Sequence, residues 1–155
     1  MSMLQYFLDN SLVHYASQQP QDWQQAIRIS CEALKRQGFV TDQYVDAVID
    51  CVNEHGPYIV IAPGIAMPHA MSSNPGVLGT AISFTKFKKP VTFFDENTGE
   101  RPEAELFFTL AAQDPDTHLS NIQRLMELLM DEELIEKIKL TRTIEDFQAL
   151  VASTR

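Results

Sequence analysis

Four histidines are the side chains best suited to proton transfer or nucleophilic chemistry near neutral pH. They are His14, His55, His69 and His118, and their spacings match no local metal-ligand signature, although ligands can also converge in space. The sequence has no Walker loop and no G-x-G-x-x-G, G-x-S-x-G or H-E-x-x-H motif. Nucleotide binding and serine or zinc hydrolysis therefore lose their usual sequence support, and we interpret His14 and His55 as structural or surface residues.

His69 differs from the other histidines because of the peptide around it. Pro68 fixes its own φ angle and holds Met67 extended, so the imidazole is presented from a stiff backbone. The small side chains of Ala66 and Ala70 leave space beside the ring. This arrangement suits a nucleophile that a bulky partner must reach, and the alternative is a turn whose histidine merely packs.

His118 lies in the segment Asp114-Pro115-Asp116-Thr117-His118-Leu119. The turn residues and the apolar stripe that follows them place it in or near the first turn of a helix. Free amides and a partial positive charge at a helix start favour an anion and disfavour imidazolium. The alternative interpretation is an exposed histidine with no role beyond the helix start.

Helices are expected on both sides of a block of strands. A strand around 12–15 precedes a helix that begins near Trp23 and stops at Gly38, and a second helix runs from the N-cap Thr41 to Gly56. The carboxyl third is also helical, with apolar stripes over 119–129, 134–138 and 144–150.

The strands are predicted at 58–62, 80–85, 91–94 and 104–112, and the one long irregular stretch is 70–76. Helices before and after a strand block favour an α/β fold, a three-layer α/β/α sandwich with a mixed central sheet. The length and the lack of internal repeats predict a single domain over residues 1–155.

Twelve basic residues against twenty-one acidic residues give a net charge of −9, which argues against nucleic-acid binding. Cys31 and Cys51 form no C-x-x-C pattern, so we interpret them as free, buried thiols. The sequence contains neither a secretory signal nor an apolar stretch long enough to span a membrane. We therefore expect a reduced, cytoplasmic protein.

The peptide Gly64-Ile65-Ala66-Met67-Pro68-His69-Ala70 resembles the G-[IL]-A-[IVM]-P-H-[GA] signature of the fructose/mannitol-type enzyme IIA of the bacterial phosphoenolpyruvate:sugar phosphotransferase system. The preceding string, residues 56–63, is most similar to the ascorbate branch, and the similarity extends over nearly the whole chain. The resemblance implies an α/β/α sandwich and no metal or organic cofactor. It also implies a phosphoryl group taken from the phosphocarrier protein HPr, passed to an enzyme IIB and used with a membrane enzyme IIC.

In that family the phosphorylated atom is Nε2 of the histidine, which here would be His69 and would leave Nδ1 to bond a backbone carbonyl. A second active-site histidine of the family matches His118, to which the resemblance assigns stabilisation of the phosphoryl group. This sequence departs from the family in two places. Cys51 aligns with an arginine of the mannitol and fructose branches, and Ala70 and Met71 follow His69 where related sequences often have glycine and some have arginine next.

Three functions stay open at this point. The leading hypothesis is a phosphocarrier for a sugar system of the ascorbate or pentitol kind, and the alternative is a regulatory module whose phosphohistidine controls protein partners. The third is a metal-dependent enzyme that uses His69 and His118. Ile65, Met67 and Met71 flank the nucleophile and are predicted to contact partners, with core packing as their alternative. Whether the chain forms a homo-oligomer is also open.

Overall fold

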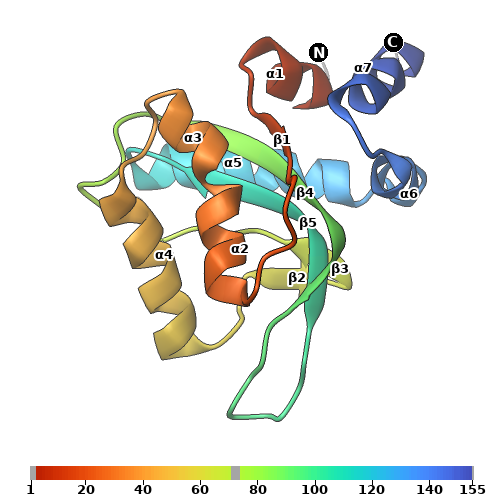
Figure 1. The fold of residues 1–155 in the computed structure, drawn as a ribbon. Helices are drawn as coiled ribbons and strands as arrows, with labels where there is room; N and C mark the ends of the chain where they lie inside the picture. Colours follow the sequence, from red (N-terminus) through yellow and green to blue (C-terminus); the bar gives the residue numbers. More distant parts are fainter. Residues whose placement is uncertain (1–2, 71–73, 155) are drawn as a thin grey trace.

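The computed structural model describes residues 3–70 and 74–154, and its centre is a five-stranded mixed sheet with helices on both sides (Figure 1). The strand order is β1-β4-β5-β3-β2, in which β1 pairs parallel to β4 and β3 pairs parallel to β5. The other two neighbouring pairs are antiparallel. The strands are β1 (Val13–Tyr15), β2 (Val60–Ala62), β3 (Gly64–Ala66), β4 (Ala81–Thr92) and β5 (Glu103–Ala111). The predicted α/β sandwich with a mixed sheet is confirmed.

Seven helices make up the helical layers of the described ranges. They are α1 (Met3–Asp9), α2 (Trp23–Ser30), α3 (Glu32–Arg36), α4 (Asp42–His55), α5 (Pro115–Leu129), α6 (Glu132–Leu140) and α7 (Ile144–Ser153). In Figure 1, α2 and α4 lie in front of the sheet and α5 lies behind it. No helix in residues 3–70 and 74–154 combines the length and apolar composition needed to cross a membrane.

Successive residues of β4 contact the two helical layers in turn, as the pleat of a strand requires. The hydroxyl of Ser83 donates to the carbonyl of Ser30 in α2, whereas the ring of Phe84 stacks on Phe147 in α7 at 5.5 Å. Phe84 also packs on Phe108 of β5, with ring centroids 5.2 Å apart. Because these aromatic side chains are fully buried, they account for much of the apolar area that stabilises the sandwich.

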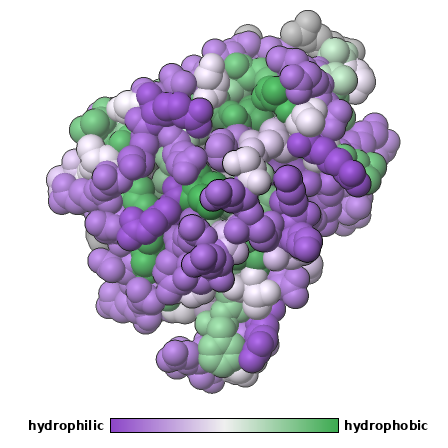
Figure 2. Space-filling view, viewed as in Figure 1, coloured by the Kyte–Doolittle hydropathy of each residue, from purple (hydrophilic) through white to green (hydrophobic). Residues whose placement is uncertain are grey.

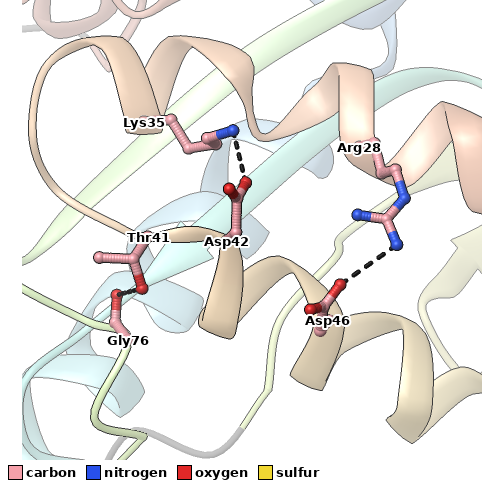
Figure 3. A network of polar contacts seen from close by, with 6 residues as sticks. All are labelled: Arg28, Lys35, Thr41, Asp42, Asp46 and Gly76. Carbon is pink, nitrogen blue, oxygen red and sulfur yellow. Dashed lines mark hydrogen bonds and ion pairs between the residues drawn. The ribbon is translucent and has the colours of Figure 1, made fainter.

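Ion pairs join α4 to the two helices before it (Figure 3). Arg28 of α2 contacts Asp46 at 3.1 Å, and Lys35 of α3 contacts Asp42 at 2.5 Å. All four side chains are largely exposed, so solvent screens these pairs and they add little to stability. The surface over these helices is mainly hydrophilic in Figure 2, which agrees with the high charge of the chain.

The start of α4 is clamped to the segment that follows the His69 peptide. Thr41 donates both its backbone amide and its hydroxyl to the carbonyl of Gly76, at 2.9 and 3.4 Å (Figure 3). Thr41 is the N-cap residue, as predicted, but its hydroxyl does not cap the helix because Gly76 takes it. Gly76 must be glycine, since a Cβ there would lie 2.4 Å from the backbone nitrogen of Tyr44.

Three sequence expectations differ from the structure. The first predicted helix is divided at Cys31 into α2 and α3, where the Ser30 carbonyl accepts the Ser83 hydroxyl. The strands expected at 80–85 and 91–94 are one strand, β4, with an irregular register between Lys86 and Val91. The short strand β3 was not expected, because three residues after a proline give no periodic signal.

Candidate functional site

His69 lies just beyond β3, on a backbone that is held from both neighbouring strands. The amide of Met67 donates to the carbonyl of Ile59 at 2.7 Å, beside β2. The carbonyl of Pro68 accepts the amide of Leu110 in β5 at 3.0 Å. The chain on either side of the histidine is thus part of the sheet's hydrogen bonding, and the stiff backbone predicted from Pro68 is present.

Two tyrosines complete this support, and the sequence pattern missed both. The hydroxyl of Tyr44 accepts the amide of Ala70 at 3.1 Å and donates to the carbonyl of Leu110. The hydroxyl of Tyr58 donates to the carbonyl of His69 at 2.7 Å, and its ring meets the imidazole edge-on at 5.3 Å. Tyr44 stands 26 residues before Ala70, so no local signal could have indicated it. Tyr58, by contrast, stands in the string before the signature peptide.

The imidazole of His69 is held in one tautomer. Its Nδ1 lies 2.7 Å from the carbonyl oxygen of Met67, and a carbonyl oxygen can only accept. Nδ1 therefore carries the proton in the neutral ring, and the lone pair is on Nε2. This is the free nitrogen that a nucleophilic histidine needs.

Burial keeps the ring neutral. It lowers the pKa of His69 below its usual value near 6.5, and the bond to the Met67 carbonyl opposes this only in part. The side chain is half-buried, so the ring still reaches the surface. At pH 7 the Nε2 lone pair is therefore available for attack on an electrophile.

The ring of His118, which the sequence predicts as the second histidine of the site, lies beside that of His69. The two imidazole centroids lie 5.5 Å apart and the rings are inclined at 46°. His118 stands in the first turns of α5, where its amide donates to the carbonyl of the N-cap residue Asp114 at 3.1 Å. The fold brings the two rings together although the residues are 49 positions apart in the sequence.

The start of α5 is already capped by its own residues. The carboxylate of Asp114 accepts the amide of Thr117 at 2.8 Å and also its hydroxyl, and these bonds lower the pKa of Asp114. These groups are therefore not free to bind an added anion. The ring of His118, rather than the helix terminus, is the donor that faces His69.

The tautomer of His118 follows from an unpaired atom. Its Nδ1 is buried and has no hydrogen-bond partner in the part of the chain that the structure describes. Leaving an N–H donor unpaired is rarer and costlier than leaving an acceptor unpaired, so the proton belongs on Nε2. Burial and the nearby His69 both lower the pKa of His118, which keeps this ring neutral too.

Cys51 lies on α4 near the site. Burial raises the pKa of the Tyr58 phenol, and the neighbouring Cys51 thiol raises it further. Tyr58 is thus a neutral donor to the His69 carbonyl. Cys51 therefore lies one contact away from the ring pair, through Tyr58.

The predicted partner contacts need correction. Ile65 and Met67 are only 5% and 6% exposed and pack in the hydrophobic core, so they offer almost no surface to a partner. The reason is local: Ile65 is in β3 and Met67 extends the same run beside Ile59, between buried neighbours. Met71 lies outside the described residues, so its predicted contact stays a prediction.

The other two histidines each contact a glutamate instead. His14 is in β1, with Nε2 3.4 Å from Glu32, and burial lowers its pKa. His55 is exposed at the end of α4 beside Glu54. Within residues 3–70 and 74–154, no group of three or more His, Cys, Asp or Glu side chains is placed to hold a metal ion.

Comparison with protein families gives one match that spans almost the whole chain. Residues 6–154 match the family described as phosphoenolpyruvate-dependent sugar phosphotransferase system, EIIA 2. The mannitol-specific cryptic phosphotransferase enzyme IIA component of Escherichia coli (strain K12) is 36% identical over 140 residues, covering 89% of each chain. The ascorbate-specific PTS system EIIA component of Shigella boydii is 34% identical over 133 residues, covering 85% of this chain and 84% of that one.

A solved structure also resembles this fold. It is the complex of enzyme IIAMTL and phosphorylated enzyme IIBMTL from Escherichia coli, which superposes with a TM-score of 0.71 at 26% identity. The match covers 92% of this chain and 94% of that chain. The mannitol and ascorbate relatives are almost equally similar to this chain, so identity alone does not separate the two specificities.

The two histidines should titrate as a coupled pair. His69→Gln should raise the pKa of His118 towards its usual value, because it removes the imidazolium that His69 forms at low pH. Histidine ring NMR across pH 4–9 measures this, with His14→Gln as the control that leaves His118 unchanged.

The pKa values of both rings lie below 6.5 in the folded chain, so the unfolded chain binds more protons near pH 6. The free energy of unfolding should therefore fall as the pH drops below 6.5, less steeply in His69→Gln. If His118 has the same pKa in His69→Gln as in the unaltered protein, the two rings are not coupled.

Proposed function

Because this chain belongs to the family of phosphoenolpyruvate-dependent sugar phosphotransferase system EIIA 2 proteins, we propose that it relays phosphoryl groups through Nε2 of His69. The donor is phospho-HPr and the acceptor is a sugar-specific enzyme IIB, which works with a membrane enzyme IIC. The reaction takes place in the cytoplasm. The observation that carries the proposal is the bond from Nδ1 of His69 to the Met67 carbonyl, which leaves Nε2 as the nucleophile.

The transfer needs little beyond this geometry. The Nε2 lone pair attacks phosphorus, a new N–P bond forms, and the bond between phosphorus and the donor breaks. The imidazole of His69 keeps its Nδ1 proton and gains positive charge, which the Met67 carbonyl oxygen at 2.7 Å stabilises. The same steps run in reverse when enzyme IIB attacks the phosphoryl group, so neither step requires a metal or an organic cofactor.

His118 supports the phosphoryl group from the side. With the proton on Nε2 and the ring 5.5 Å from that of His69, it can donate one hydrogen bond to a phosphoryl oxygen. The donor is neutral in the resting protein, so it does not protonate the leaving nitrogen prematurely. Its contribution is therefore to preorganise the transferred group rather than to carry it.

The partner surface is formed by exposed apolar side chains near the ring pair instead of Ile65 and Met67. Leu119 follows His118 and is 56% exposed, and Tyr58 beside His69 is 39% exposed. Leu78, also exposed, lies near the start of α5, where its carbonyl accepts the side chain of Gln113. This set, with Met71 as a further candidate, offers an apolar rim to HPr and enzyme IIB in turn.

Sugar specificity is a property of the system that the chain serves. The relatives named above serve mannitol and ascorbate systems, and we propose a substrate of the ascorbate or pentitol kind. The phosphoryl group is the only cargo that this chain handles, so specificity must come from recognition of the matching enzyme IIB. A regulatory module would also be phosphorylated on His69, which makes onward transfer to enzyme IIB the decisive property.

His69→Gln should abolish phosphorylation, because glutamine has no nucleophilic lone pair at the Nε2 position. The measurement incubates the protein with phosphoenolpyruvate, enzyme I and HPr, and detects an acid-labile, alkali-stable phosphoprotein. His55→Gln, at an exposed histidine beside Glu54, is the matched control and should be phosphorylated normally. A phosphorylated glutamine variant would show that His69 is not the acceptor.

His118→Ala should leave the protein phosphorylatable but slow transfer to enzyme IIB by about 10² to 10³, the usual cost of losing one preorganised donor. Rapid-quench measurement of transfer from the phosphorylated variant to the cognate enzyme IIB gives this rate. His118→Gln should recover part of it, since an amide nitrogen can also donate. Transfer at the unaltered rate would reduce His118 to a bystander.

Leu119→Asp should weaken binding of HPr and of enzyme IIB by about tenfold or more, because it puts a charge into a desolvated contact. Leu140→Asp is the matched control, since Leu140 is 79% exposed at the end of α6 and should not affect binding. Titration calorimetry measures both, and the melting temperatures should be nearly unchanged. Equal losses in the two variants would place the docking face elsewhere.

A further inference from the structure

A cavity of about 460 Å³ lies between the β1–β4 edge of the sheet and the connection from α6 to α7. Its lining contains three basic residues in a chain whose net charge is −9. The lining residues are Tyr15, Ala16, Lys86, Phe87, Lys88 and Arg142. The size falls within the range of small-molecule sites, and nothing in the phosphoryl relay uses these residues.

The cavity is separate from the ring pair. The backbone of the His69 peptide is bonded to Leu110, near the end of β5, whereas Lys86 pairs with Leu106, four residues earlier on that strand. At about 3.4 Å per residue this displacement along the sheet is roughly 14 Å. Two strands, β4 and β5, also stand between β1 and β3 in the sheet order.

Lys86 is the residue that points to a ligand. It is only 7% exposed, yet its ammonium group has no hydrogen bond or ion pair with any residue in the described ranges. The ammonium group is not among the buried unpaired atoms of those ranges, so the buried stem of Lys86 carries its charge to the cavity, where an anion can pair with it. The exposed side chains of Lys88 and Arg142 line the same cavity and also have no acidic partner in that part of the chain.

The walls of the cavity are ordered by a chain of hydrogen bonds. The hydroxyl of Tyr15 donates to Thr141 Oγ1 at 2.7 Å, and that hydroxyl donates to the carbonyl of Ile138 at 2.6 Å. Burial raises the pKa of Tyr15 to about 12, so the phenol is neutral. The Tyr15 ring is fixed edge-on against Phe84 at 6.1 Å, which makes it a rigid apolar wall.

Asp146 is an acidic residue whose charge reaches the cavity wall at Tyr15, and its carboxylate is already hydrogen-bonded. The carboxylate of Asp146 accepts the backbone amide of Arg142 at 2.9 Å, and its charge also acts on Tyr15. It forms no ion pair with Lys86, Lys88 or Arg142 within the described residues. The local charge of the cavity is therefore positive, against the negative charge of the whole chain.

We propose that this cavity binds a small organic phosphate monoester, with the phosphate between Lys86, Lys88 and Arg142 and the carbon skeleton against Tyr15. The two negative charges of a phosphate monoester are attracted by these three cations, and guanidinium and ammonium groups both bind phosphate oxygens well. The apolar wall of the cavity favours an esterified phosphate over inorganic phosphate. The binding does not depend on His69, because neither the cavity nor its residues contact the ring pair.

The test is titration of the whole protein with phenyl phosphate and with inorganic phosphate at low salt, followed by amide NMR and calorimetry. Phenyl phosphate should bind more tightly than inorganic phosphate and shift the amide signals of Ala16, Phe87 and Arg142. Lys86→Met, which keeps the length of the side chain, should weaken binding by about ten- to a hundredfold, the usual cost of a charged hydrogen bond. Lys89→Met is the matched control, because this exposed lysine of β4 does not line the cavity, and it should bind as before.

Two further variants separate this cavity from the ring pair. Arg142→Gln should also weaken binding if Lys86→Met fails to fold, and His69→Gln should bind phenyl phosphate normally. The proposal is overturned if the unmodified protein binds neither compound, or if Lys89→Met weakens binding as much as Lys86→Met. It is equally overturned if His69→Gln loses the binding, since the anion would then be at the ring pair.

Discussion

The hydrogen bond from Nδ1 of His69 to the carbonyl of Met67 is the interaction on which the site depends. It fixes the tautomer and the direction of the ring, and in the proposed relay it would stabilise the positive charge of a phosphorylated imidazole. The carbonyl can do this only because it cannot move: the amide of Met67 is bonded to Ile59 and its side chain is buried. The burial that removes Met67 from the surface is thus also what holds its carbonyl, and therefore the His69 imidazole, in place.

The sheet order explains how two distant histidines meet. β3 and β5 are parallel neighbours, so their carboxyl ends reach the same edge of the sheet. His69 follows β3, and α5 with His118 begins four residues after the end of β5. α4 then secures the edge, because Tyr44 bonds Ala70 and also packs against Gly76, six residues further along the chain.

Much of this could be predicted from the sequence, because helices and buried strands have periodic patterns and the signature peptide is specific. The mixed sheet, His69 and the meeting of His69 with His118 are of this kind. The support from Tyr44 and the cavity that gathers Lys86 with Arg142 could not be predicted, since both depend on contacts between residues far apart in the sequence. The prediction that Ile65 and Met67 contact partners was wrong for a related reason, since an apolar side chain suits a partner surface and the core equally well.

The most direct test of the account is NMR of the phosphorylated, ¹⁵N-labelled protein, in which phosphorus couples to the nitrogen that carries it. The account predicts coupling to Nε2 of His69, with Nδ1 still protonated and its proton protected from exchange by the Met67 carbonyl. Coupling to Nδ1, or to any residue other than His69, would contradict the central claim that this backbone bond selects the nucleophile.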